Sequence, residues 1–453
     1  MHLIRHVLLI TVFSILFASC TAIQEMDSLS GRSEEAKRLS GGTNDVSPLP
    51  ELDENATLED YIKYALLNNP GLKASFERWK AALENVEPAR TLPDPRLTYS
   101  NYIEEVETRV GAQRHSIGLA QTFPWFGKLD LRGEIALQSA NAEQQRYEAA
   151  KLDLIYLVKT LYYELCYLTQ AINITRENVT LVTYFESVAR AKYKGGTGLQ
   201  NAVIKTQVEL GRLEDSLLSL QDLIKPITAK LNIALNRPAN MPFPLPKIIP
   251  EEKYDLKDED LLSILRIENP NLKVLDFIAA KEDLAVKLAE KDFFPDLTLG
   301  VNYIDTQPRS NMNQPDNGKD PVIANLSVNL PIWRQKYNAE SRGAQARYRA
   351  AMNERIEKEN SLIADLEMAL YKLRDAGRKI DLYQYTLMPK AEQSVQINQQ
   401  AFTSDKASFL ELIDSQRILL EFQMQHKRVL ADYAQRLAEV EKLAGGDFER
   451  KPK

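Results

Sequence analysis

Four stretches of the chain alternate between apolar and small polar residues, which is the pattern of β-strands. The alternation is strict over Leu297–Tyr303 and Ala324–Leu330, and the predicted strands span about residues 97–105, 115–123, 297–304 and 323–332. Successive side chains of a strand point to opposite faces, so each predicted strand has one apolar face and one small, polar face. The apolar positions of the second strand pair are Leu297, Leu299, Val301, Leu326, Val328 and Leu330.

Long stretches with helical periodicity follow each strand pair. Residues 128–194 contain no proline and one glycine, and their apolar residues recur at helical spacing. At 1.5 Å per residue this predicts a helix of roughly 100 Å. A glycine-rich turn at 195–198 separates it from a return helix, and the second half repeats the pattern. We therefore predict helical hairpins at about 128–235 and about 338–443, packed side by side as coiled coils because their apolar stripes are narrow.

The same landmarks occur twice, about 200 residues apart. Asn69-Pro70 recurs as Asn269-Pro270, and Phe123-Pro124-Trp125-Phe126 recurs as Leu330-Pro331-Ile332-Trp333. This order indicates two copies of one structural unit, at 57–237 and 258–444. A proline-rich linker spans 238–257, and a charged tail without predicted structure follows at 445–453.

The amino terminus has the pattern of an export signal. Arg5 precedes an apolar run, and Ala18-Ser19-Cys20 follows it. The ending resembles the lipobox of bacterial lipoproteins, which implies a signal peptide at 1–19 and palmitate-type acylation of Cys20. The alternative is a plain secretory signal, whose Cys20 is discarded. Residues 20–56 are polar and predict a tether.

Composition excludes several classes of function. A net charge of −6 with dispersed Lys and Arg argues against nucleic acid as a partner. The sequence contains no phosphate-binding glycine loop, no metal-ligand spacing and no nucleophile with a His partner, so we expect neither catalysis nor a cofactor. Cys166 lies among Leu and Tyr residues of the long helix and is expected to be a buried structural thiol.

The strand faces leave two interpretations open. One is an edge hairpin on a soluble core. The other is a membrane strand pair, favoured by the neutral polar face and by lengths near those needed to cross a bilayer. Four strands cannot close a barrel, and open edges are excluded from lipid. Two, three or four copies of the chain would supply enough strands.

Taken together, the order of these landmarks resembles the TolC-like outer membrane efflux family over about residues 57–444. The resemblance implies a mainly α fold with a β-barrel portion: a homotrimer whose hairpins form an α-barrel and whose strands form a 12-stranded transmembrane barrel. It implies a channel, not an enzyme, that docks on a periplasmic adaptor and an inner-membrane pump of the resistance-nodulation-division class. Residues 91–95 and 123–128 look most like members of the heavy-metal branch.

The resemblance also assigns roles to the hairpin turns. The adaptor and pump would dock on two turns, and two acidic residues, Glu411 and Asp414, would ring the pore constriction. From their spacing alone these two are ordinary solvated charges. The residues of the turns are Gly195, Gly196, Thr197, Gly198, Leu199, Ser404, Asp405, Lys406, Ala407 and Ser408.

Some residues depart from the family or remain ambiguous. Ala407 and Ala202 stand where better-known members carry the ion pair that ties the closed gate, so the closing contact must be built differently. Trp125 and Trp333 fit either a membrane interface or plain packing. The competing classes are an outer-membrane-anchored coiled-coil structural or adaptor protein and a soluble periplasmic enzyme. The sequence does not identify the transported substrate.

Overall fold

The computed structural model describes residues 52–453, apart from residues 54, 247–248, 250, 252, 256, 311–314, 404–407, 448–450 and 453. The chain divides into two units, residues 1–50 and 51–453, and all described elements belong to the second. The predicted signal peptide, Cys20 and nearly all of the tether therefore lie outside the described residues.

The first repeat consists of α3 (Leu58–Asn68), α4 (Pro70–Glu84), α5 (Val86–Arg90), β1 (Arg96–Thr108), β2 (Gly111–Phe123), α6 (Lys128–Lys194) and α7 (Gln200–Ala234). The second consists of α8 (Asp258–Glu268), α9 (Pro270–Lys291), β4 (Leu297–Gln307), β5 (Val322–Val328), α10 (Arg334–Leu382), η1 (Tyr383–Leu387), α11 (Met388–Thr403) and α12 (Phe409–Ala444). β3 (Tyr254–Asp255) pairs with β6 (Lys451–Pro452), so part of the tail, for which we predicted no structure, is a strand.

The strands differ in length from the alternating stretches. β1, β2 and β4 extend beyond the predicted spans at their turn-proximal ends, whereas β5 stops at Val328. Pro331 follows three residues later, and a proline cannot donate to a sheet ladder. Leu330, predicted as a strand residue, therefore lies past the end of β5.

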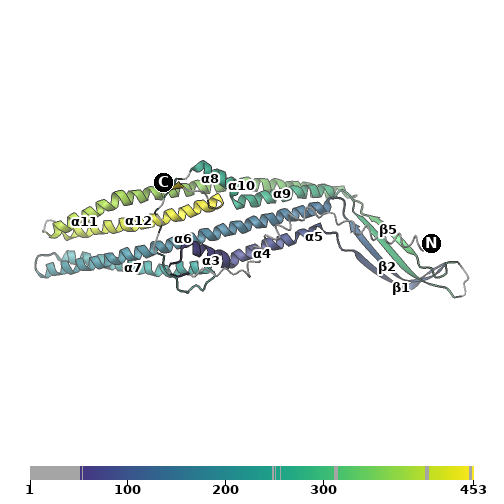
Figure 1. Ribbon diagram of the computed structural model, residues 1–453, viewed down its shortest axis with the longest axis horizontal. Helices are drawn as coiled ribbons and strands as arrows, with labels where there is room; N and C mark the ends of the chain where they lie inside the picture. The colour runs from purple at the N-terminus through teal and green to yellow at the C-terminus, as the bar shows by residue number, and fades with distance from the viewer. Residues whose placement is uncertain are drawn as a thin grey trace. The chain divides into compact units, whose positions relative to one another are not determined.

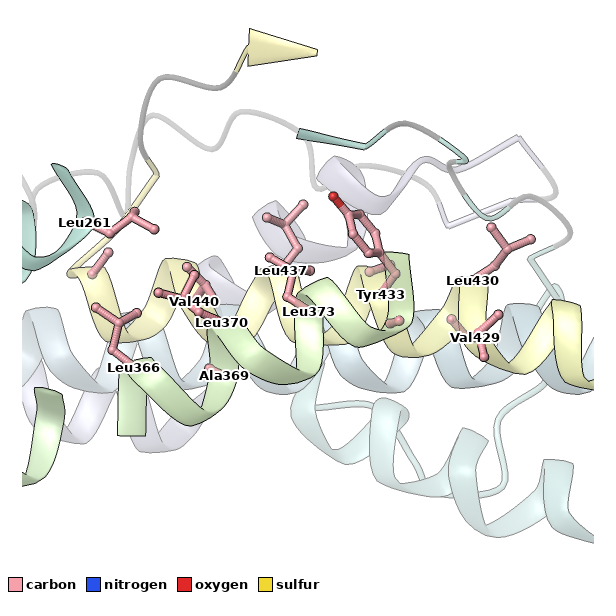
Figure 2. Close-up of a cluster of buried hydrophobic side chains, with 14 of the residues drawn as sticks. Leu261, Leu366, Ala369, Leu370, Leu373, Val429, Leu430, Tyr433, Leu437 and Val440 are labelled. Carbon is pink, nitrogen blue, oxygen red and sulfur yellow. The ribbon is translucent and has the colours of Figure 1, made fainter. Parts of the chain in front are cut away.

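Each repeat has its own apolar core, built from equivalent positions. Tyr61, Ala65 and Leu72 pack on α6 and the end of α7, and the residues 200 positions later pack on α10 and α12. Figure 2 shows the second core, where α10 and α12 lie side by side; Leu261 of α8 belongs to the same cluster. Its labelled members are Leu261, Leu366, Ala369, Leu370, Leu373, Val429, Leu430, Tyr433, Leu437 and Val440.

The duplicated Asn-Pro motif closes each repeat. The Asn69 Oδ1 accepts a hydrogen bond from the Leu72 N–H (3.0 Å), and its Nδ2 donates to the carbonyl of Ala234 (2.9 Å). In the second repeat the Asn269 Nδ2 donates to the carbonyl of Leu443 (2.8 Å). One side chain thus caps the second helix of the repeat and binds the end of its last helix. Proline is suited to the first helical position, where its N–H would have no partner.

Two parts of the long helices depart from regular coiled-coil packing. Within the hairpin predicted at about 338–443, a π-helical turn, η1, separates α10 from α11. Pro389 follows it and cannot donate to a carbonyl one turn back, which accounts for the irregularity. In the first half of α10, Met352 and Ile356 of the apolar stripe are 40% and 51% exposed. The described residues leave this part of the stripe uncovered.

The strands and the hairpin turns lie at opposite ends of the long helices (Figure 1). α6 begins after β2 and ends at the first hairpin turn, and α7 returns along it. Cys166, near the middle of α6, is fully buried, and burial raises the pKa of its thiol to about 12. This confirms the expectation of a buried thiol.

Candidate functional site

One face of the sheet is apolar and uncovered. The strands pair antiparallel in the order β1-β2-β4-β5. Cross-strand partners place Leu97, Leu119 and Val301 in one row. Soluble proteins rarely expose a continuous apolar surface of this kind. The larger side chains of the face are 38–71% exposed: Leu97, Tyr99, Ile117, Leu119, Leu297, Leu299, Val301, Tyr303, Val322, Leu326 and Val328.

The opposite face carries small and polar residues. Thr122, Thr298 and Ser327 form one row, in which the two threonine hydroxyls are 2.9 Å apart. Gly118 faces Asn302, and a Cβ added at Gly118 would meet the Asn302 Oδ1 at 2.1 Å. At these positions the face offers neutral hydrogen-bonding groups and little bulk.

Both edges of the sheet are open. β1 and β5 each pair with one neighbour among the described residues. β1 has 13 residues and β5 has 7, so long rows of backbone N–H and C=O groups are left without a strand partner. Such edges must be covered or paired before the sheet can lie in a membrane.

A buried lysine joins the β2–α6 junction to the α9–β4 junction. The Lys128 Nζ lies 2.9 Å from the Asp296 Oδ1 and 3.3 Å from the Asp292 Oδ1, and its side chain is 4% exposed. Asp296 also accepts a hydrogen bond from the backbone N–H of Trp125 (2.9 Å). Burial opposes ionisation of Asp296, but these two donors outweigh it and hold the pKa of Asp296 below its usual value. Sequence reasoning missed this node, because Lys128 and Asp296 belong to different repeats.

The first hairpin turn is compact. Gly196 adopts φ of 75°, a left-handed conformation that favours glycine. The N–H groups of Thr197 and Gly198 each donate to the carbonyl of Lys192 at 3.0 Å, and Leu199 is 75% exposed. Of the second turn, Ser408 is described, whereas Ser404, Asp405, Lys406 and Ala407 lie outside the described residues.

Both predicted constriction residues lie on the exposed face of α12, and each has a local partner. The Glu411 carboxylate accepts a hydrogen bond from the Ser408 N–H (2.8 Å), and the Ser408 Oγ accepts one from the Glu411 N–H (3.3 Å). This capping box stabilises the start of α12. Asp414 pairs with Arg417 at 2.8 Å. Sequence reasoning missed Arg417, whose charge offsets part of the acidic field.

The tips of the two hairpins meet in an aromatic cluster. Phe185 of α6 packs edge-on against Phe409 of α12, with centroids 6.1 Å apart, and Phe402 of α11 lies 5.2 Å from Phe409. Lys192 lies over the Phe402 ring at 4.1 Å. Ala202 packs against the same cluster, at the position where the resemblance would place an acidic residue. An apolar contact thus joins the hairpins of one protomer here. We name this set the tip cluster: Phe185, Ala189, Phe402, Phe409, Leu412 and Ile413.

A polar contact also joins the hairpins, further from the tips. The Arg428 guanidinium binds both oxygens of Glu164 at 2.8–2.9 Å and also contacts Asp432. Gln416 donates to the Asn178 Oδ1 across the same helix pair (3.0 Å). These bonds fix the register of α12 on α6.

Sequence comparison identifies the family. The profile described as "Outer membrane efflux protein" matches residues 61–237 and 261–446, one block for each repeat. The chain belongs to the outer membrane efflux protein family. Members of this family are outer membrane efflux channels and not enzymes.

Individual relatives are distant in sequence. The chain is 25% identical to toxin and drug export protein A of Aggregatibacter actinomycetemcomitans over 258 residues, 55% of this chain and 56% of that protein. It is 22% identical to the cobalt-zinc-cadmium resistance protein CzcC of Cupriavidus metallidurans over 419 residues, 89% of this chain and 94% of that protein. The first match thus spans little more than half of its relative.

The fold has the same architecture as that of solved family structures. The outer membrane protein VceC of Vibrio cholerae superposes with a TM-score of 0.72 at 18% identity, covering 86% of this chain and 97% of that one. Within the described part of the efflux chain, no helix combines the length and apolarity needed to cross a membrane. No group of three His, Cys, Asp or Glu side chains in the same residues could hold a metal ion.

Proposed function

We propose that three copies of this chain form a passive exit duct across the outer membrane. Each copy would contribute four strands to a 12-stranded β-barrel and two hairpins to a helical barrel in the periplasm. The observation that carries this proposal is the four-stranded sheet with an exposed apolar face and two open edges. Pairing β5 of one copy with β1 of the next would satisfy the edges, and the apolar face would meet lipid.

The helices support assembly with further copies. Met352 and Ile356 lie on the apolar stripe of α10 but are 40% and 51% exposed, and Ile204 and Val208 of α7 are 51% and 59% exposed. Coiled-coil stripes of this kind are normally buried against another helix. Neighbouring protomers would cover them in a closed ring of hairpins.

The lipid-facing assignment is tested with adjacent residues on opposite faces. Leu299 lies on the apolar face and Thr298 on the polar face. Leu299→Asp should reduce formation of a heat-modifiable trimer in the outer-membrane fraction, because a carboxylate on the lipid face destabilises each of the three subunits. The matched control Thr298→Asp should assemble. Equal assembly of both variants would show that the apolar face does not meet lipid.

In this proposal the duct is the outer component of a tripartite efflux system. The hairpin turns would receive a periplasmic adaptor, and an inner-membrane pump of the resistance-nodulation-division class would deliver the cargo. One relative is named for metal resistance and another for toxin and drug export. Deleting the gene and measuring sensitivity to cobalt, zinc and cadmium beside a panel of drugs separates these classes of cargo.

Glu411 and Asp414 would form a cation-favouring constriction where three copies of α12 converge. Convergent carboxylates between low-dielectric walls attract cations, although Arg417 reduces the contribution of Asp414. The trimer in a planar bilayer should be cation-selective and blocked by multivalent cations from the periplasmic side. Glu411→Ala with Asp414→Ala should abolish the block, whereas Glu421→Ala, an exposed acid on the same helix, should retain it. An unchanged block in the double variant would remove these residues from the constriction.

The chain would reach its membrane as a lipoprotein acylated at Cys20. The support is the sequence ending Ala18-Ser19-Cys20. Labelled palmitate should enter the wild type and not Cys20→Ser. Equal labelling of the two would exclude acylation at this residue.

A further inference from the structure

The segment between β5 and α10 exposes bulky apolar side chains. Leu330, Ile332 and Trp333 are 72%, 66% and 74% exposed. Phe126, which follows β2 at the same end of the sheet, is 83% exposed. These exposed residues lie beyond the last paired residues of the sheet, at the end where the strands meet the helices.

The two tryptophans near the strand-to-helix junctions differ in packing and exposure. Trp125 stacks on Phe294 with centroids 5.2 Å apart and an interplanar angle of 11°. Trp333, which aligns with Phe126 in the repeat pattern, has no ring contact among the described residues and is 74% exposed. The stack on Phe294 therefore accounts for Trp125 but not for the exposed Trp333.

Cations follow directly after the exposed residues. Arg334 and Lys336 lie in the first turns of α10 and are exposed. Arg334 makes no ion pair within the described part of the chain. Lys336 is 3.8 Å from Glu340, with its side chain 63% exposed. We name the set of Phe126, Leu330, Ile332, Trp333, Arg334 and Lys336 the junction patch.

We infer that the junction patch binds the phospholipid headgroup layer at the periplasmic side of the membrane and prefers anionic phospholipids. This inference rests on the proposed barrel. Tryptophan favours the membrane–water interface, where the ring is partly buried and its N–H stays hydrated. Arg and Lys beside it can reach lipid phosphates while their stems lie along apolar surface.

Charge favours lipid over a second copy of the chain as the occupant. A protein contact over the junction patch would remove Arg334 from water, which is costly unless an acidic partner is supplied. A layer of lipid phosphates provides that partner without a specific geometry. The apolar side chains would lie at the level where headgroups meet acyl chains.

Quenching of tryptophan fluorescence tests this placement. The chain has three tryptophans, and Trp79 is 3% exposed. Full-length trimer would be placed in phosphatidylcholine vesicles brominated either near the headgroup or deep in the acyl chain. The wild type should lose more emission than Trp333→Phe. The difference between the two losses measures quenching of Trp333, and it should be at least twofold larger with the shallow bromines than with the deep ones.

A reporter in the sheet separates failure of this inference from failure of the proposed barrel. Val301→Trp, in the middle of β4 and on its apolar face, should be quenched by the deep bromines in the Trp333→Phe background. If Val301→Trp is quenched while wild type and Trp333→Phe respond alike, the junction patch does not meet lipid and the barrel stands. If neither reporter is quenched, the sheet is not in the membrane, and both proposals fail.

Brominated phosphatidylglycerol then tests the charge preference. At equal mole fraction it should quench Trp333 at least twofold more than brominated phosphatidylcholine. Arg334→Gln with Lys336→Gln should equalise the two lipids, Arg334→Lys should keep the preference, and the charge-matched control Arg342→Gln with Arg349→Gln should keep it too. The anionic specificity would be overturned if the two lipids quench the wild type equally. It would also be overturned if the Arg334→Gln, Lys336→Gln variant keeps the preference for phosphatidylglycerol.

Discussion

Truncation of Phe409 should uncouple the tips of the two hairpins. Phe409 is 8% exposed and contacts Phe185 of α6 and Phe402 of α11. Replacing a buried phenylalanine by alanine costs about 3–5 kcal/mol in a rigid core. The helix end can relax, so we expect about 2–3 kcal/mol for opening of the tip, which corresponds to about a 30- to 150-fold larger population of the open form.

Hydrogen exchange measures this opening directly. In Phe409→Ala the amides of 185–189 in α6 and 409–413 in α12 should exchange faster together, because one cluster holds both segments. The control Ile418→Ala removes a side chain that is 46% exposed on the same helix, and tip exchange should change by less than about threefold. Acceleration confined to α12 would refute the idea that the tip cluster couples the hairpins.

Three further predictions concern stability. Lys128→Met should lower the free energy of unfolding by about 3 kcal/mol, since it leaves Asp292 and Asp296 without their buried cation. Thermal dissociation of the trimer measures this change, and an unchanged transition would contradict it. Because the pKa of Asp296 is lowered in the folded chain, its carboxylate adds fully to the free energy of unfolding above its unfolded pKa. This contribution should be lost as pH falls through the folded pKa, and Asp296→Asn should remove that part of the acid dependence. Burial lowers the pKa of His426, so stability should decline as pH falls below about 6.5, and His426→Gln should flatten the pH dependence of the unfolding midpoint.

The strand and helix patterns could be read from sequence because they depend on local periodicity. Alternation at 297–303 follows from the pleat of one strand, and the glycine-broken helices follow from side chains a turn apart. The Asn-Pro repeat could also be recognised from neighbouring residues. The hydrogen bond from its Asn side chain to the last helix of each repeat could not. The limits of this reasoning appear at β5, which stops at Val328, and at η1, where Pro389 changes the helical bonding.

The sequence by itself determined the duplication, the two-faced strands and the long hairpins, since each is set by neighbours along the chain. Only the tertiary structure decided which distant groups meet. It placed Lys128 beside Asp296, joined Phe185 to Phe409, and stacked Trp125 on Phe294 while leaving Trp333 exposed. These pairings depend on how one helix or strand is positioned along another, and side chains from segments about 200 residues apart carry no local pattern that fixes that position.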